Sequence, residues 1–396
     1  MDFGRQPAGS TSYTVTQVYL GSKNNWGLTS VPQKKKSSKK TLKYNQDIRR
    51  KLLAWYDKTK RDLPWRKTKD PYSIWVSEIM LQQTQVKTVI PYYERWVKIL
   101  PTIDKLANAP EQKILKLWEG LGYYSRAKNL KKSALIIHKK MNGNLPKTVK
   151  DLQNLPGIGR YTAGAISSIA FGLKAPVLDG NVKRVFSRLF CINDNGTTSS
   201  FENCLWEIAE DLLPVRRPGD FNQALMELGA TVCTPKSPTC QQCPVRTICH
   251  AFLKDSVNKF PSTKKKISSK KIEVSAGIIT KNKMVYIQQR VKNGLMGGLW
   301  EFPGGKREKG ESLEECLKRE IKEELRATIE ISKKVMTIKH TYTNFRVILH
   351  VFDCQLQDKI IRPNGCEQWK WVSLSNLKKY PFPAANVKIV KYLTKK

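Results

Sequence analysis

The stretch that decides the fold runs from Leu155 to Arg184 and reads LPGIGRYTAGAISSIAFGLKAPVLDGNVKR. Pro156, Gly157 and Gly159 predict a tight turn with exposed backbone amides, because glycine adopts the conformations that such turns require. Small and apolar residues from Tyr161 to Phe171 then predict a helix. A turn that feeds the N-terminus of a helix is a ready binding site for a phosphate group.

One carboxylate follows in the same stretch, that of Asp179. Val177 and Leu178 precede it, and Gly180 and Asn181 follow, so we expect Asp179 to begin a helix close to the turn. An acid beside a phosphate site indicates chemistry on a nucleic acid. A helical hairpin with a capping aspartate accounts for the same residues without any catalytic function.

The overall charge points the same way. The 396 residues include 71 Lys and Arg against 33 Asp and Glu, a net charge of +38, which favours a polyanionic partner such as nucleic acid. A membrane surface is the rival partner, but no apolar run approaches the roughly 18 residues of a spanning helix. A lysine-rich genome is the competing explanation of the charge. The length itself predicts two or three domains.

Residues 1–43 are rich in Gly, Ser, Thr and Gln and contain the run KKKSSKK, so we interpret them as a disordered basic arm. Apolar residues then recur at helical spacing, which predicts a helical domain over residues 44–253. Its expected helices begin at Tyr44, occupy Asp70–Leu100 with a break near Gln82–Gln85, and then cover Glu111–Glu119, Arg126–Met141, Asn203–Leu213 and Phe221–Thr231.

Two features of this helical region carry candidate chemistry. Glu78 is a carboxylate among Ile74, Trp75 and Ile79. If Glu78 faces inward, the loss of solvation raises its pKa and lets it act as an acid near neutral pH, whereas facing outward it is an ordinary solvated side chain. The run Leu121–Tyr124 (LGYY) is a turn with two tyrosines, which suit stacking against bases as well as core packing.

Cys233, Cys240, Cys243 and Cys249 form the pattern C-x6-C-x2-C-x5-C. Four thiolates at this spacing can close round one metal centre, and a zinc ion, with His250 as a substitute ligand, fits the spacing as well as an iron-sulfur cluster does. The total of nine cysteines is odd and argues against a secreted disulfide framework, so we expect a reducing compartment.

Residues 254–271 are rich in lysine and are expected to form a flexible linker. Beyond it, apolar residues alternate with a period of two, which predicts a separate α+β domain over residues 272–396. Strands are expected at Ser275–Thr280, Met284–Gln289, Val335–Lys339, Arg346–Gln355 and Glu367–Val372, and helices at Glu311–Arg326 and Ala385–Leu393.

The helix from Glu311 concentrates acidic residues in an otherwise basic chain. Glu320, Glu323 and Glu324 share one helical face, and paired carboxylates are what a magnesium ion on a diphosphate needs. Arg319 and neighbouring lysines can pair with these glutamates instead, in which case the charges serve only the solubility of the helix.

Five motifs occur in order: SEIMLQQTQV (Ser77–Val86), LGYYSRA (Leu121–Ala127), LPGIGRYTA (Leu155–Ala163), VLDGNVKR (Val177–Arg184) and the four-cysteine pattern. Together they closely resemble the adenine-specific DNA glycosylases of the MutY type, from about Tyr44 to the C-terminus. The resemblance implies a multidomain fold, with an all-α helix-hairpin-helix glycosylase domain that carries an iron-sulfur cluster loop, followed by an α+β Nudix-like domain.

The resemblance also implies roles for the candidate residues. Glu78 would protonate adenine and then act as the base for water, and Asp179 would stabilise the sugar cation. The four cysteines would hold a 4Fe-4S cluster. The other implied residues are the hairpin glycines Gly157 and Gly159, the wedges Gln83 and Tyr123, Tyr161 and Asn181 in the site, Trp65, Arg66 and Gln223 in the adenine pocket, and Lys183 near an abasic product.

Residues 305–327 resemble a Nudix box, with Gly305, Glu311, Arg319, Glu320, Glu323 and Glu324 at the expected offsets and Arg326 in place of a glycine. In MutY-type enzymes this domain is usually a damage reader that recognises 8-oxoguanine opposite adenine. Its recognition loop often carries Phe-Ser-His, where this chain has Tyr342, Thr343 and Asn344. The surviving carboxylates leave magnesium binding and nucleotide hydrolysis open.

Two alternative activities remain. An endonuclease III-like glycosylase/lyase needs a lysine nucleophile in the hairpin, where this chain has Tyr161. A DNA-tethered Nudix pyrophosphohydrolase of the nucleotide pool would act through the acidic helix. Our main expectation is a monomeric base excision repair enzyme that binds double-stranded DNA containing an adenine mispair and no membrane, and that is cytoplasmic, or nucleoid-associated in a bacterium.

Overall fold

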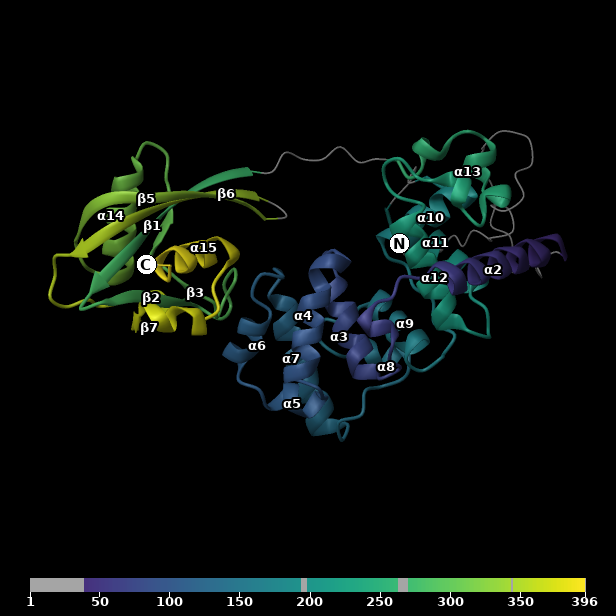
Figure 1. Ribbon diagram of the computed structural model, residues 1–396, viewed down its shortest axis with the longest axis horizontal. Coiled ribbons are helices and arrows are strands. Elements are labelled where there is room, and N and C mark those ends of the chain that lie inside the picture. The colour runs from purple at the N-terminus through teal and green to yellow at the C-terminus, as the bar shows by residue number, and fades with distance from the viewer. Residues whose placement is uncertain (1–38, 194–197, 263–269, 343–344, 396) are drawn as a thin grey trace, which may run out of the picture. The chain divides into compact units, whose positions relative to one another are not determined.

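The computed structural model describes residues 39–193, 198–262, 270–342 and 345–395 (Figure 1). The chain divides into two compact units, one from Met1–Glu78 with Leu145–Lys264 and the other from Ile79–Asn144 with Lys265–Lys396. Most of the expected basic arm and part of the expected linker, residues 1–38 and 263–269, lie outside the described residues. The last residues of that arm are helical, because the first described helix begins at Lys39.

The first unit is helical and is built round one apolar core. Phe186, Leu205 and Phe221 are fully buried at its centre. Burial of each such side chain stabilises the fold by roughly 1.5–3 kcal/mol, which holds the ends of the helices in place. Its α-helices are α2 (Lys39–Thr59), α3 (Pro71–Leu81, up to Glu78 in this unit), α8 (Val149–Gln153), α9 (Arg160–Ile169), α10 (Gly180–Phe190), α11 (Thr198–Leu212), α12 (Pro218–Thr231) and α13 (His250–Leu253).

The stretch from Leu155 to Arg184 forms the predicted turn between helices, with α9 and α10 behind it. Gly157 has a φ of +82°, a conformation that side chains rarely adopt, so the turn requires glycine there. Close packing also brings α12 against the start of α10, since a Cβ added at Gly229 would lie 2.6 Å from the Cβ of Asn181. This close packing fixes the start of α10, where Asp179 is the N-cap residue.

The second unit begins with helices. They are α4 (Val86–Ile99), α5 (Ile103–Asn108), α6 (Glu111–Leu117) and α7 (Ser125–Lys140), so the break predicted near Gln82–Gln85 is confirmed. Trp96 and Trp118 are fully buried and pack edge to face, with ring centroids 5.5 Å apart. This contact joins α4 to the residues that follow α6.

The rest of the second unit is a seven-stranded mixed sheet with two helices, α14 (Leu313–Leu325) and α15 (Ala384–Leu393). In β1, Ile278 packs in the apolar cluster that includes α15 residues, and Ile279 packs in the cluster that includes α14 residues. Successive strand residues point to opposite faces, so each helix covers one face. The strands are β1 (Lys270–Lys281), β2 (Met284–Arg290), β3 (Trp300–Glu301), β4 (Gly304–Lys306), β5 (Ile329–Thr341), β6 (Phe345–Leu356) and β7 (Cys366–Ser373).

The sheet contains two short strands that the alternation of apolar residues did not predict. The order is β3-β2-β1-β6-β5, with β4 on β1 and β7 on β2, and β1 and β6 run parallel. Every strand predicted from the period of two is present, and β3 and β4 are two further strands that this period did not predict. They are two and three residues long, too short for an alternating pattern to appear. No helix among the described residues is long and apolar enough to cross a membrane.

Candidate active site

Glu78 lies in α3 and is only 5% exposed. Its carboxylate accepts a 2.8 Å hydrogen bond from the hydroxyl of Tyr161. Burial raises the pKa of Glu78 to about 7, a rise that the Tyr161 hydrogen bond opposes and the nearby Asp179 carboxylate increases. The outward, solvated orientation is therefore excluded, and Glu78 can hold a proton near neutral pH.

Asp179 is the N-cap residue of α10. One carboxylate oxygen accepts from the Val182 amide at 2.7 Å and the other from Nδ2 of Asn181 at 3.0 Å. Burial raises the pKa of Asp179, while these hydrogen bonds favour its charged form and oppose the rise. The predicted cap is present, and it lies close enough to Glu78 to affect its proton. The structure thus places two interacting carboxyl groups near each other, and only that of Asp179 accepts hydrogen bonds from a backbone amide and an asparagine side chain.

Tyr161 of α9 is the hydrogen-bond partner of Glu78. Burial, together with the Glu78 and Asp179 carboxylates, raises the pKa of Tyr161 well above its ordinary value. The hydroxyl therefore stays protonated and donates a hydrogen bond to Glu78. The hydroxyl also lies 3.2 Å from Sδ of Met226 in α12. At this position the pocket therefore offers a phenol and no amine.

The residues expected around adenine come from the short helix η1 (Pro64–Arg66) and from α12. Trp65 and Gln223 are both buried. Arg66 donates from Nη2 to Oε2 of Glu227 at 2.7 Å, so an ion pair joins the two elements. The three expected pocket residues thus belong to elements that are locked to each other.

Glu227 is a functional candidate that the sequence analysis missed. Arg61 binds both of its oxygens, at 2.7 and 2.8 Å, in addition to Arg66. Burial disfavours the charged form of Glu227, but the hydrogen bonds from the two arginines outweigh it and lower its pKa to about 2. The signal was available, because Glu227 is an acid in an apolar helix, just as Glu78 is.

Asn181 and Arg184 extend the pocket along α10. Arg184 donates to Oδ1 of Asn181 at 2.8 Å and to the carbonyl oxygen of Gly229 at 2.7 Å, while its Nε donates to the carbonyl oxygen of Cys233 at 2.7 Å. Asn181 in turn donates to Asp179. Arg184 therefore connects the residues around Asp179 to the first cysteine of the four, a role the sequence analysis did not assign.

Two further predicted groups lie in the first unit. Lys183 forms an ion pair with Glu202 of α11. At Gly159, the N-cap of α9, an added Cβ would meet nothing within 4 Å, so the hairpin is open on that side. Gly157 supplies the turn conformation described above. The open hairpin suits the approach of a phosphate backbone.

The expected wedges lie in the second unit, on the loops before α4 and α7. Gln83 is exposed, with a φ of +54°, and Tyr123 is 39% exposed, with a φ of +46°. Both therefore adopt a backbone conformation that is uncommon outside glycine.

The four cysteine thiols line one small cavity, together with Arg188 and Val232. Arg188 is 3% exposed, and it donates to the Cys233 sulfur at 3.4 Å and to the carbonyl oxygen of Thr234 at 2.7 Å. Burial raises the pKa of the Cys243 thiol to about 12, so the thiolates need a metal or other cation to form. His250 does not line this cavity. The substitute-ligand role considered for it therefore has no support.

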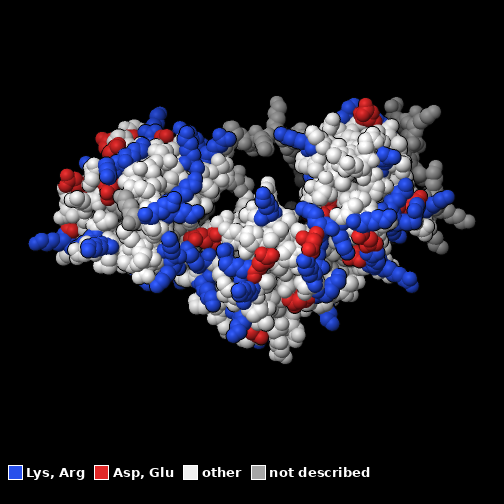
Figure 2. All heavy atoms as spheres, in the orientation of Figure 1, with Lys and Arg blue, Asp and Glu red and all other residues white. Residues whose placement is uncertain are grey.

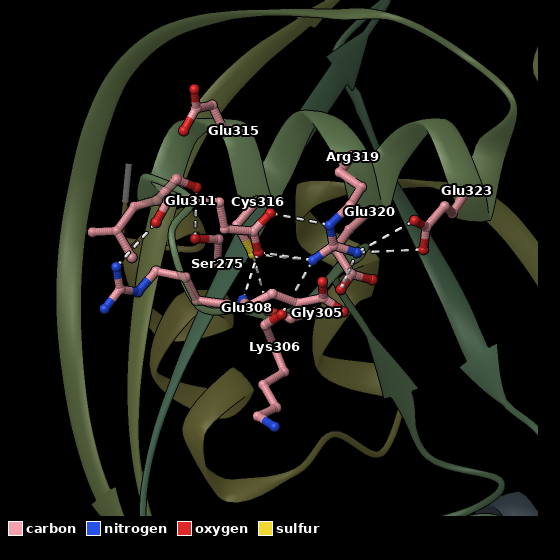
Figure 3. A network of polar contacts seen from close by, with 12 residues as sticks. Ser275, Gly305, Lys306, Glu308, Glu311, Glu315, Cys316, Arg319, Glu320 and Glu323 are labelled. Atoms are coloured by element: carbon pink, nitrogen blue, oxygen red, sulfur yellow. Dashed lines mark hydrogen bonds and ion pairs between the residues drawn. The ribbon is translucent and has the colours of Figure 1, made fainter.

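The Nudix-like box forms the turn before α14 and the helix itself (Figure 3). Arg319 is placed among the carboxylates, binding Glu311 at 2.9 and 3.1 Å, Glu320 at 3.0 Å and Glu323 at 3.4 Å. Glu324 instead accepts from the Gly304 amide at 3.0 Å. Across the described residues, no three acidic, histidine or cysteine side chains converge on a point that a metal ion could occupy.

The departure from the box pattern at Arg326 is accommodated. Arg326 caps α14 with a φ of +51°, the left-handed conformation for which glycine is the usual residue. At Gly305, an added Cβ would lie 2.2 Å from the Glu320 carboxyl carbon, so a larger residue would displace the Glu320 carboxylate. The box therefore keeps its helical shape, with Arg319 placed between its carboxylates.

Comparisons with known proteins cover both parts of the chain. Residues 76–211 match the family described as HhH-GPD superfamily base excision DNA repair protein, and residues 274–392 match the NUDIX domain family. An adenine DNA glycosylase of Buchnera aphidicola subsp. Acyrthosiphon pisum is 35% identical over 87% of this chain and 97% of its own length. The chain belongs to the adenine DNA glycosylase family.

Other relatives in the adenine DNA glycosylase family are longer. The protein of Rattus norvegicus is 42% identical over 65% of this chain and 60% of its own length, and that of Schizosaccharomyces pombe is 32% identical over 83% and 86%. This chain spans 39% of the length of the human relative, with 50% identity. Family membership confirms the predicted fold class, with a helix-hairpin-helix glycosylase part followed by a Nudix-like part.

Tyr342 is the one residue of the predicted recognition loop, residues 342–344, that the structure describes. Tyr342 donates from its backbone amide to the carbonyl oxygen of Phe345 at 2.9 Å, and its ring contacts His340 and Phe345, with centroids 4.5 and 5.0 Å away. Thr343 and Asn344 lie outside the described residues. The base of the loop is therefore an ordered aromatic cluster.

Proposed function

We propose that this protein is a monofunctional DNA glycosylase that hydrolyses the N-glycosidic bond of adenine mispaired with 8-oxoguanine or guanine in duplex DNA. The observation that carries the proposal is Glu78, a buried carboxyl group that is held by Tyr161 and has its pKa raised to about 7 beside Asp179. Family membership supports the same reaction.

The two carboxyl groups divide the reaction between them. Neutral Glu78 donates its proton to a ring nitrogen of adenine, which makes the base a better leaving group, and the resulting carboxylate then takes a proton from the attacking water. Asp179 remains an anion and stabilises the positive charge that develops on the sugar. Neither group can reach a stacked base, so the adenine is flipped out of the helix at a cost of a few kcal/mol.

The residues around the acids fit this scheme. Trp65, Arg66 and Gln223 form the pocket for the flipped adenine, and Tyr161 and Asn181 orient the two acids through their hydrogen bonds. A lyase step needs an amine nucleophile. Tyr161 provides none, and the ion pair with Glu202 lowers the availability of Lys183, so hydrolysis without strand cleavage is favoured.

The cysteine loop fits a 4Fe-4S cluster better than zinc. The four thiols share one cavity, and the C-x6-C-x2-C-x5-C pattern resembles the cluster loop of the MutY-type enzymes. When bound, the cluster would cross-link residues 233–249, and Arg188 and Arg184 would hold that loop against α10.

The Nudix-like part is proposed to recognise the base opposite adenine through Tyr342, Thr343 and Asn344. Magnesium-dependent hydrolysis is not favoured, because Arg319 forms ion pairs with Glu311, Glu320 and Glu323 and so competes with a metal ion for these carboxylates. Lysine and arginine side chains are spread over the visible surface (Figure 2), which suits a phosphate backbone as partner. We propose the domain limits 44–253 and 272–396, joined by residues 254–271, and a monomer on DNA.

The decisive test is the Glu78→Gln variant in a single-turnover assay of adenine release from a duplex with 8-oxoguanine opposite. Removal of the general acid should lower the rate about 10²–10⁴-fold. Glu207→Gln, a substitution of a half-buried glutamate of α11 outside the pocket, is the matched control and should keep the wild-type rate. Equal rates for Glu78→Gln and wild type would contradict the proposed acid.

A further inference from the structure

Arg126, near the start of α7, is a buried cation whose role the proposed reaction does not use. Its side chain is 8% exposed, and burial lowers its pKa to about 10, so it remains charged at neutral pH. A buried charge is costly unless polar groups replace its hydration. Arg126 finds these groups on two loops of the second unit.

The first loop joins α3 to α4. Nη1 of Arg126 donates to the carbonyl oxygens of Ile79 and Met80, each at 2.9 Å, and of Gln82 at 2.5 Å. Nη2 donates to Oγ1 of Thr84 at 3.2 Å. These acceptors lie on both sides of Gln83 in the sequence. The guanidinium therefore holds the backbone from which the exposed Gln83 side chain projects.

The second loop joins α6 to α7. Nη2 of Arg126 donates to the carbonyl oxygens of Leu121 at 3.1 Å and Gly122 at 3.2 Å, just before Tyr123. The guanidinium carbon also lies 5.5 Å from the ring centroid of Tyr123 and 5.2 Å from that of Trp118. One planar group thus binds both loops at once, which the point charge of a lysine does less well.

Both loops need this support. Gln83 and Tyr123 have φ values of +54° and +46°, and such strained non-glycine conformations persist only where the surrounding structure holds them. Wedging a side chain into DNA costs a few kcal/mol per unstacked step, so the base of the wedge must resist displacement. A shared anchor supplies that resistance to both loops.

We propose that Arg126 is a positioning residue that couples the Gln83 and Tyr123 loops, so that both side chains enter the DNA in one step. The inference rests on the proposed function, because it takes Gln83 and Tyr123 as wedges. Arg126→Lys should slow adenine release from duplex DNA about tenfold or more, because an ammonium group cannot replace all the hydrogen bonds that the guanidinium donates to the two loops. The fluorescence of 2-aminopurine at the target position should show the same loss in the flipping step.

A double-mutant cycle separates positioning from general stability. If Arg126 acts through Tyr123, then Arg126→Lys added to Tyr123→Ala should cause little further loss. Lys131→Met is the matched control: Lys131 also lies in α7 and donates to carbonyl oxygens, those of Ala107 and Ala109, but it binds neither loop. The Lys131→Met variant should flip adenine out of the duplex and release it at the wild-type rates.

Three outcomes would overturn the inference: a wild-type flipping step in Arg126→Lys, equal losses in Lys131→Met, or losses in the double mutant that multiply. If Arg126→Lys does not fold, Thr84→Val replaces it in the cycle, with an expected loss of about threefold from one hydrogen bond; coupling to Tyr123→Ala supports the inference and independence contradicts it. A wild-type protein that releases no adenine from any duplex would instead refute the proposed function.

Discussion

Glu78 in α3 and Glu311 before α14 are glutamates with a close hydrogen-bond donor, yet their pKa values move in opposite directions. The pKa of Glu78 rises to about 7, chiefly because the group is buried. The pKa of Glu311 falls to about 2, chiefly because of its hydrogen bonds with Arg319. Glu78 can therefore keep a proton near neutral pH, whereas Glu311 is held as an anion in an ion pair with Arg319.

Glu78 and Glu227, both in the first unit, show the same contrast in the direction of their pKa shifts. Glu227 is as buried as Glu78, but Arg61 and Arg66 lower its pKa to about 2. The two arginines neutralise Glu227 and leave Glu78 with a phenol as its hydrogen-bond partner. The difference teaches that the position of each arginine, more than the burial of each glutamate, decides which one can act as an acid.

The largest effect on the rate of adenine release is expected from Asp179→Asn, which tests whether the site needs a second carboxylate beside Glu78. Asparagine can still cap α10 but carries no charge, so the sugar cation loses its stabilisation and the rate of adenine release should fall about 10²–10³-fold. Single-turnover kinetics measure this loss. Asp151→Asn, an exposed aspartate in the first turn of α8, is the control with an unchanged rate. Full activity of Asp179→Asn would show that the pocket does not use its second carboxylate.

The next effect concerns stability. Glu227→Gln should lower the free energy of unfolding by about 2 kcal/mol, less than the 3–5 kcal/mol of a fully buried pair because Arg61 is partly exposed. Since the folded pKa of Glu227 is depressed, the stabilisation should be present above the unfolded pKa of about 4.3 and be lost as the pH falls toward 2. Urea unfolding at several pH values measures it.

The surface pair Arg160–Glu210 provides the control for that measurement. Glu210→Gln should change the free energy of unfolding by less than about 1 kcal/mol at every pH. Equal effects of Glu227→Gln and Glu210→Gln would mean that burial does not distinguish the two pairs.

A third effect is the pH dependence of the reaction. Because Glu78 must be protonated to act as an acid and its pKa is about 7, the single-turnover rate should be highest below that value and fall about tenfold per pH unit above it. Because the pKa of Glu78 is about 7 in the folded state and about 4.3 in the unfolded state, its burial costs stability progressively as the pH rises from about 4.3 to 7. Glu78→Gln should therefore melt at a higher temperature than wild type in alkaline buffer. A rate that is flat from pH 6 to 9 would contradict the assignment.

The smallest effect is expected in the box. Arg319→Met removes the cation from among Glu311, Glu320 and Glu323, so magnesium should raise the melting temperature of this variant by a few degrees at most and leave wild type unchanged. Lys318→Met, on the same helix, is the control. Adenine release should be unaffected in both variants. A magnesium shift in wild type would show that Arg319 does not block the carboxylates.

Much of the fold could be predicted from local patterns. Helical spacing located α3, α4, α6, α7, α11 and α12 to within a few residues, and alternation located all strands except the very short β3 and β4. These elements carry their own signal because one face of each is apolar. The C-x6-C-x2-C-x5-C pattern identified four thiols that do share a cavity.

The arginines were harder to predict, because an arginine side chain is long and its partner can lie anywhere in the chain. Arg61 and Glu227 are 166 residues apart, and Arg126 binds acceptors up to 47 residues away. Sequence spacing contains no information about such pairs. For the same reason the orientation of Glu78 stayed undecided, since α3 is apolar on nearly all sides and has no periodicity to indicate an inward face.

The sequence by itself determined the elements, the family motifs and the residue types that could do the chemistry, because these depend on neighbours within a few residues. Tertiary structure decided which carboxyl group keeps a proton, which arginine neutralises which glutamate, and which loops are tied together. Those outcomes depend on burial and on distances between residues far apart in the chain, and both are set only when the helices pack.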